Sequence, residues 1–149
     1  MINHVWSVLC TDTVIDNETN QLSLHSVIEQ LTILSSPIPG GLLPHKMKIA
    51  TLWIRSDANK PCKGLSRVSF ISPSGRITGS VEPEIDLSKV ERSRNIVLFD
   101  AVPIEESGRH IFRIELQNEG EDEWHQVALV PLTIVFSPQE NQEATMETE

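Results

Sequence analysis

Apolar and polar residues alternate with a period of two along most of this chain. In residues 110–117, Phe112, Ile114 and Leu116 fall on one face, and the residues between them are mostly charged or polar. This alternation is typical of a strand with one buried face. Further β-rich runs lie at about 4–15, 22–34, 46–55, 66–72, 77–85, 95–103 and 125–136, of which 22–34 contains one or two strands. The pattern predicts about eight strands.

The segments between these runs carry turn-forming residues. Residues 16–20 and 119–123 are polar clusters, and residues 72–75 read Ser-Pro-Ser-Gly, which suits a hairpin turn. Residues 36–44 contain three prolines and two glycines, which predicts a long loop. Ser88 and Glu91 match a capping box, so at most one short helical turn is expected there.

Short strands joined by turns, without alternating helices, favour an all-β antiparallel β-sandwich over a parallel nucleotide-binding sheet. We expect an immunoglobulin-like or C2-like sandwich, formed as a single domain by residues 1–136. Residues 137–149 hold four Glu and no basic residue. Low hydrophobicity and a single sign of charge predict a disordered acidic tail there, either a solubilising end or a docking peptide for a basic partner.

The charge balance limits the classes of partner. The chain has 12 Lys and Arg against 21 Asp and Glu, a formal charge of −9, and residues 1–136 alone carry −5. Nucleic acids and anionic membranes are bound largely through their phosphates, so we expect neither as the main partner. The longest apolar run, residues 127–136, is too short to span a bilayer, and the amino end lacks the basic start of a secretory signal. These features predict a cytoplasmic protein with two free thiols, Cys10 and Cys62.

Two stretches carry a resemblance to a known family. The first comprises LCTD at residues 9–12, ETNQLSL at 18–24, the Pro- and Gly-rich loop and the strand at 46–55; the second is GRHIFRI at 108–114. They resemble a bacterial family of small β-sandwich proteins of unknown function. The resemblance covers about residues 5–136 and implies a sandwich and a bacterial origin. It carries over no catalytic or ligand residue and so implies no activity, and His110 stands where the family often has Tyr.

No catalytic constellation is visible in the sequence. The five histidines lack the spacing of metal ligands, and we expect His110 and His125 to face each other as a surface pair across a hairpin, with a metal site as the alternative. A Gly-x-Ser-x-Gly elbow is absent. Cys10 is expected to be buried, while Cys62, in a predicted loop beside Lys63, is the more reactive thiol. We predict no enzyme activity, no cofactor, and no catalytic or metal-ligating residue.

The acidic residues allow two interpretations. Glu82, Glu84 and Asp86 alternate along one strand, and residues 119–123 are dense in carboxylates. A solvated strand face and a solvated hairpin tip explain both groups. The alternative is a calcium- or small-ligand-binding sandwich resembling a C2 domain, since calcium requires several carboxylate oxygens.

The three tryptophans are expected in different surroundings. Trp6 and Trp53 lie in apolar strands, which predicts that both belong to the core, whereas Trp124 borders the acidic tip and is expected to be partly exposed. This placement favours packing over a carbohydrate-binding platform, and the chain has no tyrosine to add to one.

Apolar residues occur where solvent is expected. Ile38, Leu42 and Leu43 lie in the loop at 36–44, where they either close one end of the sandwich or form a contact patch. The last strand is apolar on both faces, and Pro131 indicates an edge or a bulge. The candidate contact residues are therefore Ile38, Leu42, Leu43, Val127, Leu129 and Val135. The sequence favours a soluble, non-enzymatic interaction module whose partner is another protein or a second copy of the chain.

Overall fold

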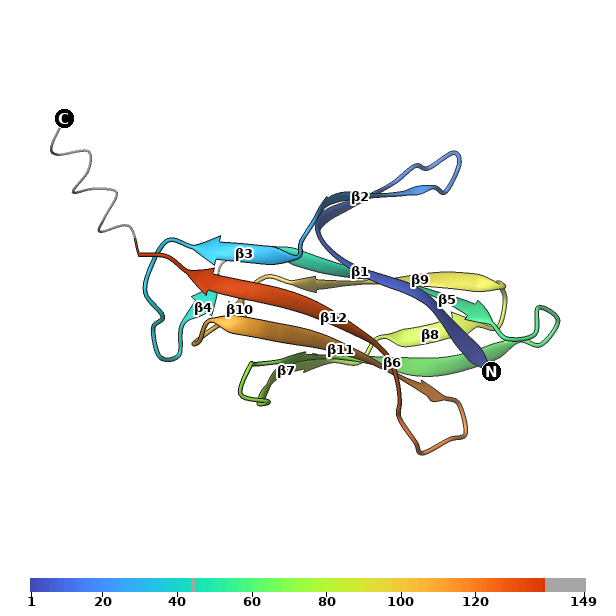
Figure 1. The fold of residues 1–149 in the computed structure, drawn as a ribbon. Coiled ribbons are helices and arrows are strands. Elements are labelled where there is room, and N and C mark those ends of the chain that lie inside the picture. The colour runs from blue at the N-terminus through green and yellow to red at the C-terminus, as the bar shows by residue number, and fades with distance from the viewer. Residues whose placement is uncertain (44, 139–149) are drawn as a thin grey trace, which may run out of the picture.

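Two β-sheets form the layers of a sandwich (Figure 1) in the computed structural model, which describes residues 1–43 and 45–138. The first sheet has four strands in the order β2-β1-β5-β9, with bounds β1 (Ile2–Ile15), β2 (Leu22–Val27), β5 (Met47–Arg55) and β9 (Arg92–Phe99). The second sheet has six strands in the order β3-β12-β11-β6-β7, with β8 also paired to β6. Its bounds are β3 (Gln30–Ile33), β6 (Cys62–Ile71), β7 (Ile77–Val81), β8 (Glu84–Leu87), β11 (Gly108–Asn118) and β12 (His125–Phe136).

The all-β sandwich predicted from the sequence is confirmed, with more and shorter strands than expected. The run at 77–85 divides at Pro83 into β7 and β8, and the run at 95–103 divides at a bend into β9 and β10 (Val102–Pro103). β10 pairs with β4 (Leu42–Leu43), which lies inside the predicted loop. Paired strands are antiparallel, apart from β3 and β12, which run parallel. The finer choice between an immunoglobulin-like and a C2-like sandwich stays a prediction.

The predicted turns at 16–20, 72–75 and 119–123 are present and join β1 to β2, β6 to β7 and β11 to β12. The helical turn allowed at Ser88 does not form; residues 88–91 make a bend, because the Asp86 carboxylate accepts the backbone N–H of Ser88 and closes a turn there. The predicted acidic tail lies outside the described residues from position 139 onward.

The core lies between the sheets because alternate side chains of the facing strands point inward. Trp53 and Ile49 of β5 pack in this layer with Phe70 of β6 and Phe112 of β11, and all four are almost fully buried. The rings of Phe70 and Phe112 have centroids 4.6 Å apart. The Trp53 indole donates a 2.7 Å hydrogen bond to Asn95 Oδ1, so its polar atom is satisfied inside the sandwich.

Two residues differ from their predicted surroundings. Trp6 is half-buried on the outer face of the four-stranded sheet instead of in the core, because a β-bulge between His4 and Trp6 reverses the side to which the following residues point. His4, before the bulge, still faces inward and packs edge-on against Trp53. Cys62, expected in a loop, begins β6 and pairs with Leu87.

The far half of β1 leaves the sheet together with β2. Residues 2–10 of β1 pair with β5, whereas residues 12–15 pair with β2 alone. The resulting hairpin bends away from the layer and turns back over its outer face, as the blue segment of Figure 1 shows. Its tip is closed by a 2.8 Å hydrogen bond from the Asn20 N–H to the Asp16 carbonyl, with Asn20 in the left-handed region at a φ of 58°.

Candidate functional site

One end of the sandwich is built from the loop that precedes β5. The short pair β4–β10 places Leu42 opposite Pro103 and Leu43 opposite Val102. A tight turn before it is closed by a 2.8 Å hydrogen bond from the Gly41 N–H to the Ile38 carbonyl. A Cβ at Gly41 would lie 2.8 Å from that same carbonyl oxygen, so this close approach requires glycine.

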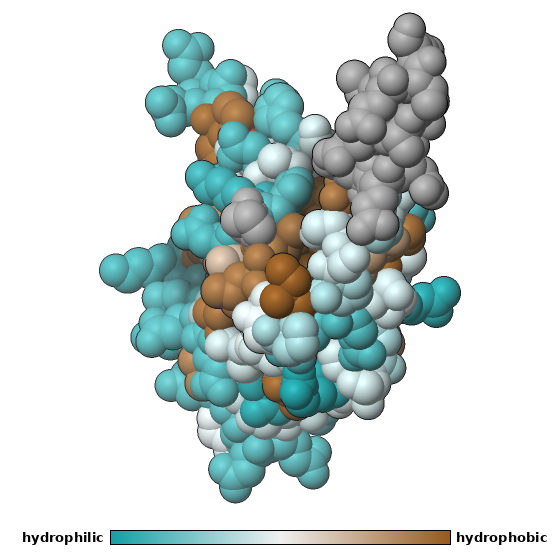
Figure 2. Space-filling view, turned by 90° about the vertical axis from the view of Figure 1, so that its left-hand side faces the viewer, coloured by the Kyte–Doolittle hydropathy of each residue, from teal (hydrophilic) through white to brown (hydrophobic). Residues whose placement is uncertain are grey.

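Apolar side chains gather on this end, which faces the viewer in Figure 2. Ile38 is 64% exposed and Leu42 is 61% exposed, whereas Leu43 is half-buried and packs on the core. A small depression of about 120 Å³ lies among them, and the described residues that line it are all uncharged. Phe136 and Ile33 from the ends of β12 and β3 complete it. We call this surface the apolar end and define it by Ile33, Ile38, Leu42, Leu43 and Phe136.

The residues of the loop differ in their surroundings, and the interpretation of the exposed ones as a contact patch stays a prediction. Leu43 closes the end of the sandwich, because it pairs with the buried Val102 and packs against the core. Ile38 and Leu42 instead remain at the surface. The apolar end is therefore partly a lid on the core and partly an uncovered patch.

The other candidate contact residues lie elsewhere. Leu129 and Val135 are exposed and Val127 is half-buried, along β12, where they do not line the depression at the apolar end. In the described chain β12 lies between β11 and β3, and β3 pairs only with residues 133–136. The part that contains Pro131 therefore has one unpaired edge, as a residue without an N–H requires. The six predicted contact residues do not form one patch.

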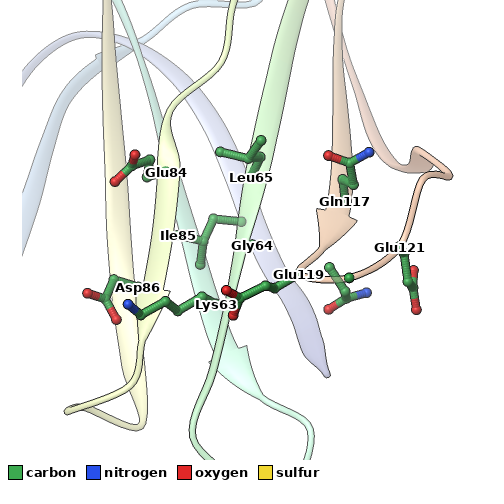
Figure 3. A pocket seen from close by; sticks show the side chains of 11 residues that line it. Lys63, Gly64, Leu65, Glu84, Ile85, Asp86, Gln117, Glu119 and Glu121 are labelled. Atoms are coloured by element: carbon green, nitrogen blue, oxygen red, sulfur yellow. The ribbon is translucent and has the colours of Figure 1, made fainter.

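The acidic residues of β8 and of the β11–β12 hairpin line the same depression. Glu84, Asp86, Glu119 and Glu121 line a depression of about 320 Å³ around Lys63 (Figure 3). The Asp86 carboxylate accepts hydrogen bonds from the hydroxyl and the backbone N–H of Ser88, and these bonds lower the pKa of its carboxyl group. Among the residues that the structure describes, no three His, Cys, Asp or Glu side chains are grouped as a metal site would require.

The histidines do not pair as predicted. His125 lies opposite Leu116, and His110 lies opposite Leu132, because the β11–β12 register places the two imidazoles at different levels. His110 is buried, is stacked on Phe70 with the ring centroids 5.3 Å apart, and is within 3.3 Å of the Gly108 carbonyl. Burial lowers the pKa of His110.

The two thiols belong to different sheets, Cys10 to β1 and Cys62 to β6. Cys10 is fully buried, as predicted, and burial raises the pKa of its thiol. Cys62 is half-buried, and its Sγ lies 3.4 Å from the Met1 carbonyl oxygen. Neither thiol is within hydrogen-bond distance of a histidine or carboxylate side chain in the described structure.

A charged cluster on the outer face of the six-stranded sheet was not predicted. Glu115 accepts two hydrogen bonds from Arg67, at 2.9 and 3.2 Å, and the Arg67 guanidinium also lies 4.2 Å from the centroid of the Trp124 ring. Trp124 is half-buried, in agreement with the prediction. Arg113 Nε lies 3.3 Å from the Glu115 carboxylate without hydrogen-bond geometry, so it contributes charge alone.

A larger groove lies beneath the β1–β2 hairpin, where no site was predicted. The hairpin and the outer face of the four-stranded sheet border a space of about 900 Å³. Trp6, Leu52 and Ile96 from three neighbouring strands form its floor, and the apolar side chains from the hairpin are Ile15, Leu22 and Leu24. The sequence does carry a signal for this surface. Ala50, Leu52 and Ile54 make the second face of β5 as apolar as the face that meets the core.

Comparisons with known proteins give no family and no function. No family model matches the chain, and no curated protein matches it. A family 123 glycoside hydrolase from Clostridium perfringens is similar over 93% of this chain, with 12% identity and a TM-score of 0.39, and this chain spans 28% of its length. The N-terminal domain of PorA is similar over 88% of this chain and 97% of its own length, with 13% identity and a TM-score of 0.32. Both likenesses are too weak to carry an argument about function. The resemblance to a bacterial family therefore stays a prediction.

Within residues 1–43 and 45–138 the structure contains no helix long and apolar enough to cross a membrane.

Proposed function

We propose that this protein is a non-enzymatic interaction module that associates with a second copy of itself through the apolar end. The observation that carries the proposal is the exposure of Ile38 and Leu42, two large apolar side chains that lie side by side on one surface. Contiguous exposed apolar surface is uncommon on monomeric proteins and marks contact sites. Ile33 and Phe136 extend the patch onto the ends of two strands.

The distribution of charge restricts contact with a second copy to the apolar end. The chain carries a formal charge of −9, so two copies repel each other wherever their acidic surfaces meet. Within residues 1–43 and 45–138, the lining of the depression at the apolar end holds no charged residue. Two copies that meet there bury apolar surface without burying like charges.

Light scattering on the wild-type chain across a range of concentrations tests the proposal. The mass should rise from 16.7 kDa towards twice that value as concentration increases. Salt should strengthen the association, because raising NaCl from about 0.05 M to about 0.5 M screens the repulsion between acidic copies. A mass that stays at the monomer value at every concentration and salt level would contradict the proposal.

A further inference from the structure

The groove beneath the β1–β2 hairpin has a polar side and an apolar side. In the register of the four-stranded sheet, Trp6 of β1 lies opposite Leu52 of β5, and Leu52 lies opposite Arg94 of β9. These three residues form one row across the outer face. Since neighbouring strands lie about 4.8 Å apart, the backbone positions of Arg94 and Trp6 are separated by about 10 Å across the row.

A second arginine lies beside the first. Arg92 is two residues before Arg94 on the same strand, pairs with Ile54, and also lines the groove. Alternation along β9 puts Arg92, Arg94 and then Ile96 on one face. Basic groups are therefore confined to one stretch of the β9 side, and apart from Ser93 the rest of the floor is apolar.

The charge of the groove is opposite to that of the chain. Among the residues that the structure describes, its lining contains two arginines and no carboxylate, although the chain has nine more acids than bases. Two acids lie near the groove in sequence: the Glu91 carboxylate lies 3.6 Å from the Arg92 guanidinium and offsets part of its charge, and Asp16 accepts the backbone N–H groups of Glu18 and Thr19. Arg94 uses one N–H on the Asn20 carbonyl, at 2.7 Å, which leaves further donors on its guanidinium.

We propose that this groove binds a fatty-acid-type ligand, a single apolar chain that ends in one carboxylate. The carboxylate lies against Arg92 and Arg94, and the chain crosses Leu52 towards Trp6 beneath the hairpin. Arginine matches a carboxylate because its planar fork of N–H donors can pair with both oxygens. The inference is independent of self-association, because it uses a different face of the sandwich.

The dimensions of the groove suit such a ligand. Its volume of about 900 Å³ lies in the range of small-molecule sites, which are mostly apolar with a few polar groups that orient the ligand. The hydrogen bond from Arg94 to the Asn20 carbonyl holds the hairpin tip over the groove. A short chain of eight carbons can cross the row from Arg94 to Trp6 with the carboxylate at the β9 side.

The test uses octanoate and 1-octanol, two eight-carbon probes that differ in charge. Each is titrated into the ¹⁵N-labelled full chain, and the indole N–H signals of Trp6, Trp53 and Trp124 report where it binds. The variants are Arg92→Gln, which removes one groove charge and leaves the Arg94 contact in place, and Arg109→Gln, a matched loss of an exposed arginine on the other sheet.

Octanoate should shift the Trp6 signal saturably and leave the Trp53 and Trp124 signals in place. The affinity for octanoate should fall about threefold or more in Arg92→Gln and stay unchanged in Arg109→Gln, whereas the affinity for 1-octanol should be the same in all three proteins. Decanoate should bind more tightly than octanoate, by about fourfold for each added methylene. The proposal is overturned if octanoate leaves the Trp6 signal unmoved, if it shifts the residues of the apolar end instead, or if the two variants respond alike.

Discussion

The Arg94 guanidinium donates a 2.7 Å hydrogen bond to the backbone carbonyl of Asn20, which ties the tip of the β1–β2 hairpin to the far edge strand of the same sheet. The two residues are 74 positions apart in the chain. Asn20 itself is fixed in the left-handed region by its bond to Asp16. This contact holds the hairpin over the groove, because residues 12–15 pair only with β2.

Replacing Arg94 with Ala should free the hairpin without unfolding the sandwich. The core residues are unaffected, so the global free energy of unfolding should change by less than about 1 kcal/mol. Amide hydrogen exchange at residues 12–25 should accelerate several-fold, because local opening no longer breaks this hydrogen bond. Arg109→Ala serves as the control. Unchanged exchange in the hairpin would show that this contact does not hold it.

The Arg67–Glu115 pair should contribute to stability at neutral pH. Glu115 is mostly buried, with a side-chain exposure of 11%, and its hydrogen bonds from Arg67 lower the pKa of its carboxyl group. We expect Glu115→Gln to cost about 1–2 kcal/mol at pH 7, since two charge-assisted hydrogen bonds become weaker. Denaturant unfolding at pH 7 measures this cost, and the exposed Glu123→Gln is the control.

The pH dependence of that cost follows from the direction of the shift. Because the folded-state pKa lies below the ordinary value of 4.5, the stabilisation is fully present above that value and is lost as the pH falls through the folded pKa. The difference between wild type and Glu115→Gln should therefore shrink in acid. A difference that is constant from pH 7 to pH 3 would contradict a contribution from the ionised carboxylate.

His110 should make the fold sensitive to mild acid. Burial lowers the pKa of its imidazole, and the Gly108 carbonyl and the Glu106 carboxylate act in the opposite direction but more weakly. Between the lowered pKa and the ordinary value of 6.5, the unfolded chain binds a proton that the folded chain does not. The stabilisation that depends on a neutral His110 is therefore complete above pH 6.5, and it declines as the pH falls below that value. Burial also lowers the pKa of His4, which adds to the same effect.

His110→Phe should reduce this acid sensitivity. Phenylalanine keeps the stacking on Phe70 and removes the buried titrating group. The fall in Tm between pH 7.5 and pH 5.5 should be smaller in His110→Phe than in wild type, while the exposed His25→Gln should behave as wild type. An equal fall in wild type and His110→Phe would show that His110 does not titrate as expected.

Gly64 should tolerate no side chain, in contrast to Gly79. A Cβ at Gly64 would lie 2.6 Å from the Gln117 carbonyl oxygen and 2.9 Å from the Ile2 side chain, whereas a Cβ at Gly79 meets nothing within 4 Å. Gly64→Ala should therefore destabilise the fold by about 1–3 kcal/mol, and Gly79→Ala should be close to neutral. Urea unfolding of the two variants compares them directly. Equal stabilities would show that the β6–β11 contact can relax at no cost.

The sequence predicted the fold class because period-two alternation and turn residues act locally. The strand of Phe112 and Ile114 and the turn at Gly75 were identified from a few neighbouring residues each. The face of Trp6 and the strand that begins at Cys62 were not, because a single bulged residue decides the first and a pairing partner 25 positions away decides the second. Local patterns do not contain the register of distant strands.

The candidate surfaces show the same limit. Ile38 and Leu42 were predicted as contact residues because an apolar residue in a Pro- and Gly-rich loop is conspicuous without any pairing information. Leu129 was grouped with them on polarity alone, and the structure separates it from them. The groove was missed because it depends on Arg94 meeting a hairpin tip far away in sequence.

Sedimentation velocity on two charge variants tests self-association through the apolar end most directly. Ile38→Asp combined with Leu42→Asp places charge in the proposed interface, and Leu129→Asp places a charge on an equally exposed apolar residue outside it. Thermal unfolding first establishes that all the proteins are folded. The wild-type chain and Leu129→Asp should sediment as a concentration-dependent monomer–dimer mixture, and the double variant as a monomer. A wild-type dimer that persists in the double variant, or that Leu129→Asp dissociates instead, would contradict the assignment of the interface to Ile38 and Leu42.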